Sequence, residues 1–359
     1  MLHCAVADRV EPMIAGIAAP KTSAWARELA ESVRDPAELL RLLHLKDMAA
    51  AIPRGFPLQV PRSYIRRMRR NDPHDPLFLQ VWPDAREDAD LVGYTMDPVG
   101  DRAASVAPGV LQKYAGRVLL TLTGACAIHC RYCFRRHFPY SEENPLGYRW
   151  QETVVYLRAA NDLREVILSG GDPLMLPDER LAAMVSDLDG IGHLQRLRIH
   201  TRMPVVLPAR VDSMLCAWIR RARLRITVVL HINHAQEIDG ELANACQALA
   251  DAGAVLLNQS VLLRGINDSA AILEDLSEAL FSARVLPYYL HLLDKVTGAA
   301  HFDLPEATAR QIYADLTARL PGYLVPRLVR EQPGRLSKTL ILPAVSGPMT
   351  DSRPALAGR

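Results

Sequence analysis

The chain has 359 residues, of which 49% are apolar and 23% are charged, and its net charge is +2. The length predicts one large domain or two ordinary ones, and the composition excludes collagen, low-complexity disorder and a coiled coil. A protein that binds duplex nucleic acid carries a strong excess of positive charge, so the near-neutral balance argues against direct nucleic-acid binding.

A membrane or secreted protein is also not expected. No apolar run approaches the roughly 18 residues that span a bilayer. The short apolar patch at 13–19 follows Asp8 and Glu11 and has no cationic leader, which argues against a signal peptide. We therefore expect a soluble, cytoplasmic protein.

The first part of the chain predicts helices. Asp35 stands before a proline as an N-cap candidate, and Thr22 or Ser23 offers another. The stretch 92–110 is typical of a loop because it is rich in glycine and proline. We expect residues 1–110 to form a helical extension that acts as a lid or buttress. Its helices are predicted at 22–35, 36–45, 61–70 and 75–82.

From about residue 117, short apolar or β-branched runs alternate with helical segments. From the second run onward the repeat is close to thirty residues, the length of one βα unit, which predicts a parallel sheet with outer helices. Six units make a partial (β/α)6 barrel, since a closed barrel needs eight. Strands are predicted at 117–122, 165–169, 196–200, 225–231, 254–261 and 285–291, and helices at 178–190, 212–224, 240–253, 268–283 and 306–320.

The predicted organisation is thus an α/β chain of three parts. The helical extension is followed by the partial barrel at 111–319 and by a tail at 320–359 that is expected to return to the mouth of the barrel. Chemistry gathers at the carboxyl ends of strands in such folds. Polar residues fall at or just past the predicted strand ends: Cys126–Cys133, Ser169–Asp172, His200–Arg202, His231–Asn233, Gln259 and Asp294.

Three cysteines, Cys126, Cys130 and Cys133, lie in the sequence CAIHCRYC after the first barrel strand. Three thiolates at this spacing can bind three irons of a [4Fe–4S] cluster and leave the fourth iron free to chelate a small molecule. A structural zinc site with His129 or His137 as the fourth ligand is the alternative. Paired CxxC motifs are typical of zinc sites, so a triplet after a strand favours the cluster.

The CxxxCxxC motif in this position resembles the radical S-adenosylmethionine (SAM) superfamily. The resemblance implies that the amino and carboxylate groups of SAM chelate the open iron and that one electron from the cluster cleaves SAM. Further segments, among them RYCFRRHF, SGGDPL, HINHAQEI and PYYLHLLDKVTGAAHF, are similar to lysine 2,3-aminomutase over roughly residues 60 to 342. The segments LRLLHL and YLVPRLVRE resemble the branch of that family that serves β-lysylation of elongation factor P.

The resemblance implies two further cofactor sites. Lys338 matches the lysine that binds pyridoxal phosphate (PLP), although the family's run of glycines before it is here Gly334 to Ser337. Lys113 and Tyr114 match positions near the PLP phosphate. The SAM site is implied to include Ser169, Gly170, Gly171, Asp172, His231, Asn233 and Gln259. Glycines at such a place allow the backbone to approach a ligand without a Cβ atom in the way.

The resemblance also implies a lysine site. Arg135 matches the position that binds the α-carboxylate, a task that suits a planar bidentate cation. Asp294 and Glu331 match the two acidic positions that receive the ε-ammonium, with glutamate at 331 in place of the family's aspartate. The longer side chain shifts the ammonium by about one methylene. Two acidic groups favour lysine over glutamate as the substrate.

The expected activity is the conversion of (S)-α-lysine to (R)-β-lysine by 1,2-amino migration, which is an isomerase reaction. It begins at an unactivated methylene that no protein base can deprotonate. The expected partners are L-lysine, an electron donor, elongation factor P and its lysyl-tRNA-synthetase-like ligase.

Two other functions stay open on the sequence. One is a free-standing lysine 2,3-aminomutase of metabolism, against which the lack of a long C-terminal extension argues. The other is a zinc-stabilised module that binds RNA or protein. The arginine-rich run at 66–70 could contact tRNA or a partner, although a solvated helix face explains it more simply.

Overall fold

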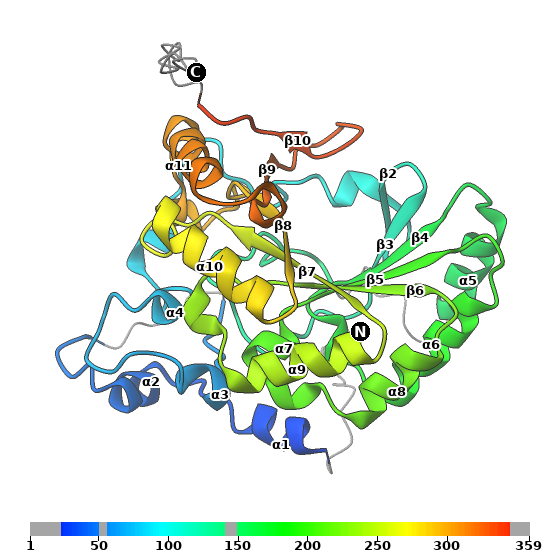
Figure 1. The fold of residues 1–359 in the computed structure, drawn as a ribbon, viewed down its shortest axis with the longest axis horizontal. Coiled ribbons are helices and arrows are strands. Elements are labelled where there is room, and N and C mark those ends of the chain that lie inside the picture. Colours follow the sequence, from blue (N-terminus) through cyan, green and yellow to red (C-terminus); the bar gives the residue numbers. More distant parts are fainter. Residues whose placement is uncertain (1–22, 50–55, 141–148, 345–359) are drawn as a thin grey trace, which may run out of the picture.

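A computed structural model describes residues 23–49, 56–140 and 149–344 (Figure 1). Within these residues ten strands form one sheet. The strands are β1 Ser105–Ala107, β2 Val110–Tyr114, β3 Arg117–Thr121, β4 Glu165–Ser169, β5 Arg196–Thr201, β6 Arg225–Leu230, β7 Val255–Val261, β8 Leu286–His291, β9 Arg327–Arg330 and β10 Thr339–Leu340.

The order of the strands in the sheet follows their order in the chain. All neighbours from β3 to β9 pair in parallel, whereas β1–β2, β2–β3 and β9–β10 pair antiparallel. In the described chain the end strands β1 and β10 do not pair with each other, so the sheet is open. This confirms the predicted α/β partial barrel and all six of its predicted strands.

Eleven α-helices and seven short 3-10 helices complete the described part of the chain. The α-helices are α1 Ala24–Ala30, α2 Pro36–Leu43, α3 Arg62–Ile65, α4 Pro76–Leu79, α5 Arg149–Ala159, α6 Asp178–Asp189, α7 Met203–Val206, α8 Ser213–Arg221, α9 Gly240–Asp251, α10 Ala270–Ser282 and α11 Glu306–Arg319. The 3-10 helices are η1 Ala85–Asp88, η2 Arg102–Ala104, η3 Pro173–Met175, η4 Pro208–Arg210, η5 Ala235–Glu237, η6 Ala300–Phe302 and η7 Gly322–Leu324.

The helices after β4 alternate with the strands and lie outside the sheet, as the βα repeat predicts (Figure 1). β4 is buried along its whole length, as expected for a strand inside a covered parallel sheet. In the N-terminal extension, Asp35 caps α2 by accepting a hydrogen bond from Ala37 N at 3.0 Å, which confirms the predicted cap. The predicted Thr22 lies outside the described residues.

The extension packs against the barrel as a buttress. Ser63 Oγ donates to the carbonyl of Val206 at 2.7 Å, and Arg67 Nη2 donates to the carbonyl of Val205 at 2.6 Å. The neighbouring Arg66 pairs with Glu241 on α9 at 3.3 Å. Arg66 and Arg67 of the arginine-rich run therefore bind groups of the protein itself.

The structure adds a hairpin that the sequence did not predict. β1 and β2 are joined by Pro108 and Gly109, and Gly109 has a φ of +71°, which a tight two-residue turn requires. The sequence predicts only a loop at this Pro-Gly pair.

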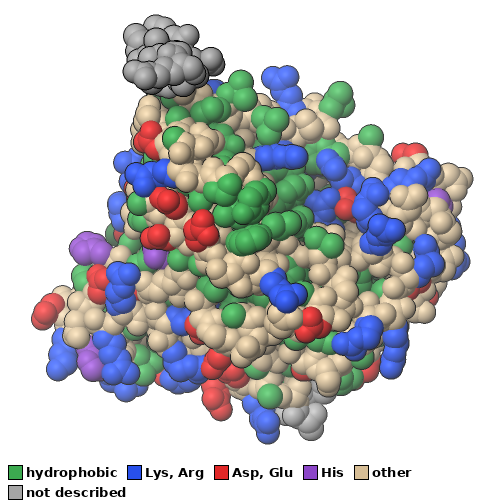
Figure 2. Space-filling model, viewed as in Figure 1, with side chains coloured by type: hydrophobic (Ala, Val, Ile, Leu, Met, Phe, Trp, Pro, Cys, Tyr) green, Lys and Arg blue, Asp and Glu red, His purple; other side chains and the backbone are tan. Residues whose placement is uncertain are grey.

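The tail returns to the barrel as predicted, because β9 pairs with β8 and β10 folds back on β9. Figure 2 shows hydrophobic side chains on the face of the molecule where Figure 1 places β8 to β10. The exposed side chains of the tail include Leu336, Leu340 and Leu342. No described helix is both long and apolar enough to cross a bilayer.

Candidate active site

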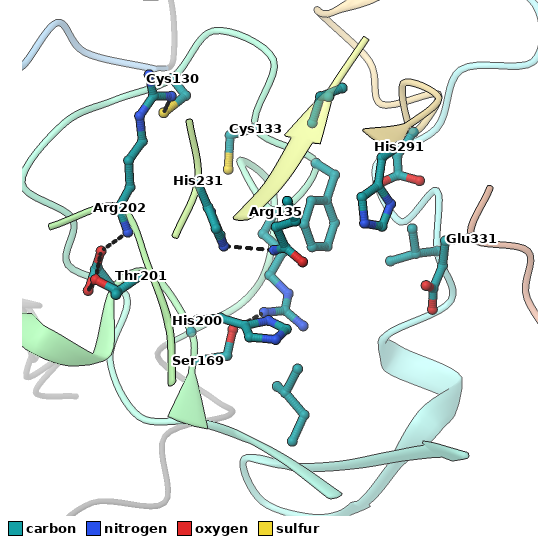
Figure 3. A pocket seen from close by; sticks show the side chains of 18 of the residues that line it. Cys130, Cys133, Arg135, Ser169, His200, Thr201, Arg202, His231, His291 and Glu331 are labelled. Atoms are coloured by element: carbon teal, nitrogen blue, oxygen red, sulfur yellow. Dashed lines mark hydrogen bonds between the residues drawn. The ribbon is translucent and has the colours of Figure 1, made fainter. Parts of the chain in front are cut away.

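One cavity of about 580 Å³ lies inside the barrel. Every site residue that the sequence predicted lines it, from the cysteine triplet to Lys338 in the tail. In Figure 3, Cys130 and Cys133 lie on one side of this cavity, His291 and Glu331 lie on the other, and Arg135 lies between them. The cavity therefore brings together residues that are more than two hundred positions apart in the chain.

The cysteine loop follows β3 and is tied to the N-terminal extension. Gln59 Nε2 donates to the carbonyl of Cys126 at 2.8 Å, and His129 N donates to the carbonyl of Gln59 at 3.1 Å. Arg131 N donates to the carbonyl of Gln80 at 2.9 Å. The extension thus fixes the backbone from which the cysteines project.

A buried ion-pair cluster holds the same loop in place. Arg131 Nε donates to Glu87 Oε1 at 2.7 Å, and Arg136 Nη2 donates to Glu87 Oε2 at 2.7 Å. Both arginine side chains and the Glu87 side chain are at least 94% buried. Sequence reasoning missed Glu87, because nothing near it in the chain marks it as the partner of a loop more than forty residues away.

The donor set fits an iron–sulfur cluster better than a zinc ion. In the described chain no group of three or more His, Cys, Asp and Glu side chains surrounds a single metal position. The two histidines proposed as zinc ligands lie against main-chain carbonyls, His129 Nδ1 at 2.9 Å from Pro57 O and His137 Nε2 at 3.3 Å from Thr297 O. Three thiols that line one cavity are the ligand number that a [4Fe–4S] cluster with one open iron needs. A structural zinc site needs a fourth ligand, and both candidate histidines contact carbonyls instead.

Two of the three thiols, Cys126 and Cys133, are buried in a way that favours their protonated form. Burial raises the pKa of Cys133 to about 11 and raises the pKa of Cys126 well above its usual value, with the neighbouring cysteines adding to the effect. Iron binds the thiolate form, so these protons are released when the cluster binds. The positive charge of the iron then compensates the negative charge of the buried thiolates.

Arg202 follows β5 and its guanidinium is buried beside the cysteine loop. Its Nη1 donates a hydrogen bond to Cys130 Sγ at 2.9 Å and also contacts the hydroxyl of Tyr132. Its Nη2 donates to Tyr64 Oη at 3.0 Å, Gln80 Oε1 at 2.8 Å and Glu237 Oε2 at 2.9 Å. The sequence marked Arg202 only as a polar residue past a strand end and gave no sign of this contact with a cysteine.

The glycines of the Ser169–Asp172 segment serve close packing of two loops. A Cβ atom on Gly170 would lie 2.5 Å from Thr123 O, and one on Gly171 would lie 2.4 Å from Ala125 O. Gly170 also has a φ of +127°. The sequence predicts a close approach of a ligand at these glycines, which line the cavity, and in the structure they also allow the cysteine loop to lie directly against this segment.

Two residues predicted to bind SAM, Asp172 and Asn233, form hydrogen bonds with other residues of the protein. Asp172 accepts hydrogen bonds from Thr201 Oγ1 at 2.8 Å and from Arg202 N at 2.8 Å. Asn233 Nδ2 donates to Tyr132 Oη at 2.7 Å. Both line the cavity, and their contacts give them a role in shaping its wall.

His231 and Gln259 form a pair in the cavity wall, with Gln259 Nε2 at 2.7 Å from His231 Nε2. Figure 3 draws this contact as the dashed line that begins at His231. Burial lowers the pKa of His231 to about 3, so the ring is neutral at physiological pH. A neutral imidazole offers one donor and one acceptor to its surroundings.

Arg135 is held by a residue that sequence reasoning missed. Its Nε donates to Asp101 Oδ2 at 2.7 Å and its Nη1 donates to Ser169 Oγ at 3.0 Å. Asp101 also pairs with Lys113 Nζ at 2.6 Å. Burial opposes ionisation, yet Arg135 and Lys113 hold the pKa of Asp101 at about 2. One carboxylate thus orients two predicted ligand-binding cations.

Glu331 and Lys338 contact each other across the tail hairpin. Glu331 also accepts a hydrogen bond from Tyr114 Oη at 2.8 Å and lies 3.4 Å from Lys113 Nζ. Asp294 has no described cation within ion-pair distance, and burial raises its pKa to about 7, against the opposing effect of Lys338. Of the two acidic residues predicted to receive the ε-ammonium, Glu331 thus has cation partners among the described residues and Asp294 has none.

The chain is similar to known proteins over most of its length. Residues 120–276 match the radical SAM superfamily. Three proteins named L-lysine 2,3-aminomutase are similar to this chain. The one from Escherichia coli (strain K12) is 48% identical over 89% of this chain and 95% of its own length. The Haemophilus influenzae protein is 46% identical over 88% and 95%, and the Clostridium subterminale protein is 34% identical over 89% and 78%. The chain therefore belongs to the lysine 2,3-aminomutase family of the radical SAM superfamily.

Proposed function

We propose that the protein is an isomerase that converts (S)-α-lysine to (R)-β-lysine by 1,2-amino migration, with a [4Fe–4S] cluster, SAM and PLP as cofactors. One observation carries the proposal: the cysteine triplet, Lys338, Arg135 and the unpaired Asp294 all line the same cavity. Lysine has a carboxylate that matches Arg135 and a distal ammonium that matches Asp294.

Different residues of the cavity would bind the cluster and PLP. Cys126, Cys130 and Cys133 would hold three irons of the cluster, and Lys338 would hold PLP. When bound, SAM on the reduced cluster supplies a carbon radical that can remove a hydrogen atom from an unactivated carbon, and PLP supplies a conjugated bond to the migrating nitrogen.

Substrate orientation rests on groups that are fixed before lysine arrives. Asp101 and Ser169 hold the guanidinium of Arg135 on two sides. A carboxylate bound there meets a cation whose rotamer is already set, which lowers the entropy lost on binding. The ring centroids of Phe134 and Phe138 lie 5.0 Å and 5.9 Å from the same guanidinium, within the range of a cation–π contact.

Glu331 has two roles in this proposal. In the absence of PLP it pairs with Lys338, and burial is outweighed by Lys338 and Lys113, so its pKa is lowered and it stays ionised. Lys338 would no longer be a partner of this carboxylate if it held PLP, while Tyr114 and Lys113 would still orient the carboxylate. Glu331 could then receive the ε-ammonium of lysine as the second acidic group.

We further propose that the β-lysine is made for elongation factor P, with a lysyl-tRNA-synthetase-like ligase as the next enzyme. The resemblance of LRLLHL and YLVPRLVRE to that branch of the family supports this. In cells that lack the protein, elongation factor P is expected to lose the mass of one β-lysyl group. An unchanged mass would favour the free-standing aminomutase of metabolism.

An anaerobic assay tests the proposed reaction. Protein with reconstituted cluster receives SAM, PLP, dithionite and isotopically labelled L-lysine, and the product is resolved by mass and chirality. We expect (R)-β-lysine from the unsubstituted protein. Lys338→Ala is expected to keep its iron and to form no product, and full activity of that variant would refute the assignment of PLP to Lys338.

A further inference from the structure

The three cysteines differ in the hydrogen bonds that their sulfur atoms accept. In the described chain, Cys130 is the one member of the triplet whose sulfur accepts a hydrogen bond from a side chain, and the donor is the cation Arg202 at 2.9 Å. Cys133 instead accepts a hydrogen bond from the backbone N–H of Arg135. One of three candidate cluster ligands therefore has a buried positive charge in direct contact.

The position of Arg202 is determined by several groups at once. Its backbone N–H donates to Asp172 Oδ2 at 2.8 Å. Its guanidinium is paired with Glu237, whose side chain is fully buried. Tyr64 and Gln80 from the N-terminal extension accept hydrogen bonds from the same Nη2 atom. A cation held from so many sides cannot swing away from Cys130.

We infer that Arg202 is a tuning residue that makes the cluster at Cys126, Cys130 and Cys133 easier to reduce. Reduction adds one electron, taken from an external donor, and that electron increases the negative charge on the cluster and its thiolates. A hydrogen bond and a positive charge at one thiolate stabilise the more negative state, and hydrogen bonds to cluster sulfurs are an established control of the potential.

The pairing with Glu237 does not cancel this effect. The Glu237 carboxylate binds Nη2 at 2.9 Å, whereas Cys130 Sγ is in direct contact with the other terminal nitrogen, Nη1. Charge interactions weaken with distance, so the thiolate feels the nearer cation more strongly than the farther anion. Tyr64 and Gln80 of the N-terminal extension help to position Arg202, so the extension also affects the reduction potential of the cluster.

The test is a redox titration of the reconstituted protein, followed by electron paramagnetic resonance in the absence of SAM. Arg202→Gln combined with Glu237→Gln removes both charges together, so no buried ion loses its partner. We expect this variant to keep its iron. At the midpoint potential of the unsubstituted protein, the ratio of reduced to oxidised cluster is expected to fall about tenfold, which corresponds to about 59 mV for one electron.

A matched control uses an equally buried pair outside the cavity. Arg210 and Asp178 contact each other at 3.0 Å, and Arg210 is fully buried. Arg210→Gln with Asp178→Asn is expected to leave the midpoint potential unchanged, whatever it does to stability. Arg202→Lys keeps a cation without the planar fork, and a midpoint between those of the double variant and the unsubstituted protein is expected.

A measurement on the unsubstituted protein does not depend on any variant folding. Protein that contains arginine labelled with 15N in its guanidinium is expected to show 15N coupling to the reduced cluster in pulsed paramagnetic resonance. Absence of the coupling, or an unchanged midpoint in an iron-loaded Arg202 variant, would refute the tuning role.

The inference rests on the cluster assignment in the proposed function, and the two fail differently. Protein that binds no iron after reconstitution would refute the cluster itself. Full iron content with an unchanged potential would refute only the role of Arg202.

Discussion

Asp294 is the residue whose ionisation decides substrate binding in this account. Burial raises its pKa to about 7, and only the ionised carboxylate attracts the ε-ammonium of lysine. Below pH 7 the empty site holds a neutral carboxyl group. The Kd for L-lysine is therefore expected to rise as the pH falls below 7, roughly tenfold per pH unit.

Calorimetric titration of the protein without PLP or reductant, in which Lys338 keeps the charge that acts on Asp294, measures this dependence between pH 5.5 and 8.5. L-Norleucine, which has no ε-ammonium, is expected to bind weakly with no step near pH 7. Asp294→Asn is expected to bind lysine weakly across the range. If the unsubstituted protein and Asp294→Asn show the same pH profile, another group receives the ammonium.

Some of the site was predictable from residue patterns and some was not. The cysteine triplet is a local spacing, and Arg135, Asp294 and Lys338 follow from motifs that resemble a family. Asp101 is different, since its role comes from contacts with Arg135 and Lys113 that no local pattern encodes. Charge partners that are distant in the chain become visible only when the fold brings them together.

The short helix η1 places Glu87 between two buried arginines of the cysteine loop. Glu87→Gln removes the carboxylate that pairs with Arg131 and Arg136, and leaves two buried guanidinium groups without a counter-charge. Loss of one partner of a buried pair costs about 3–5 kcal/mol. We expect urea denaturation to show a loss of this size and the cluster to retain less iron, because the cysteine loop loosens.

Asp84→Asn is the matched control on the same segment. Asp84 pairs with Arg86 at 2.6 Å, but the Arg86 side chain is 64% exposed, so this pair contributes at most about 1 kcal/mol. Equal losses for the Glu87 and Asp84 variants would contradict a special role of the buried cluster.

The elements themselves were predicted unevenly, for physical reasons. The six strands from β3 to β8 are apolar and repeat with the βα period, and five of the predicted helices lie close to α6 and α8–α11. The helices α3 and α4 are one turn each, shorter than their predicted segments, because turns follow them at once. β9 pairs with β8 across the intervening α11, and β10 folds back on β9. Both strands are short and lie outside the βα repeat, so no period in the sequence marks them.

At the scale of the whole molecule, the open barrel is bridged by side chains. β2 lies near one end of the sheet and the β9–β10 tail lies at the other. Tyr114 and Lys113 on β2 reach Glu331 in the tail, and Pro333 packs against Gly100. The candidate PLP site lies at this bridge, because its lysine comes from the tail and its phosphate partners come from β2.

A ligand that joins both ends of the sheet stabilises the folded state. PLP at a hundred times its Kd is expected to add about 2.7 kcal/mol to the free energy of unfolding. Thermal unfolding followed by circular dichroism is expected to show a higher Tm with PLP. The gain should be much smaller for Lys338→Ala, and an equal gain in that variant would place PLP elsewhere.

The most direct test of the account is the paramagnetic resonance spectrum of the reduced, iron-loaded protein before and after SAM is added. Three cysteines leave one iron without a protein ligand, so SAM is predicted to bind that iron and to change the spectrum. A colourless protein that contains one zinc per chain, or a spectrum that SAM does not alter, would contradict the account.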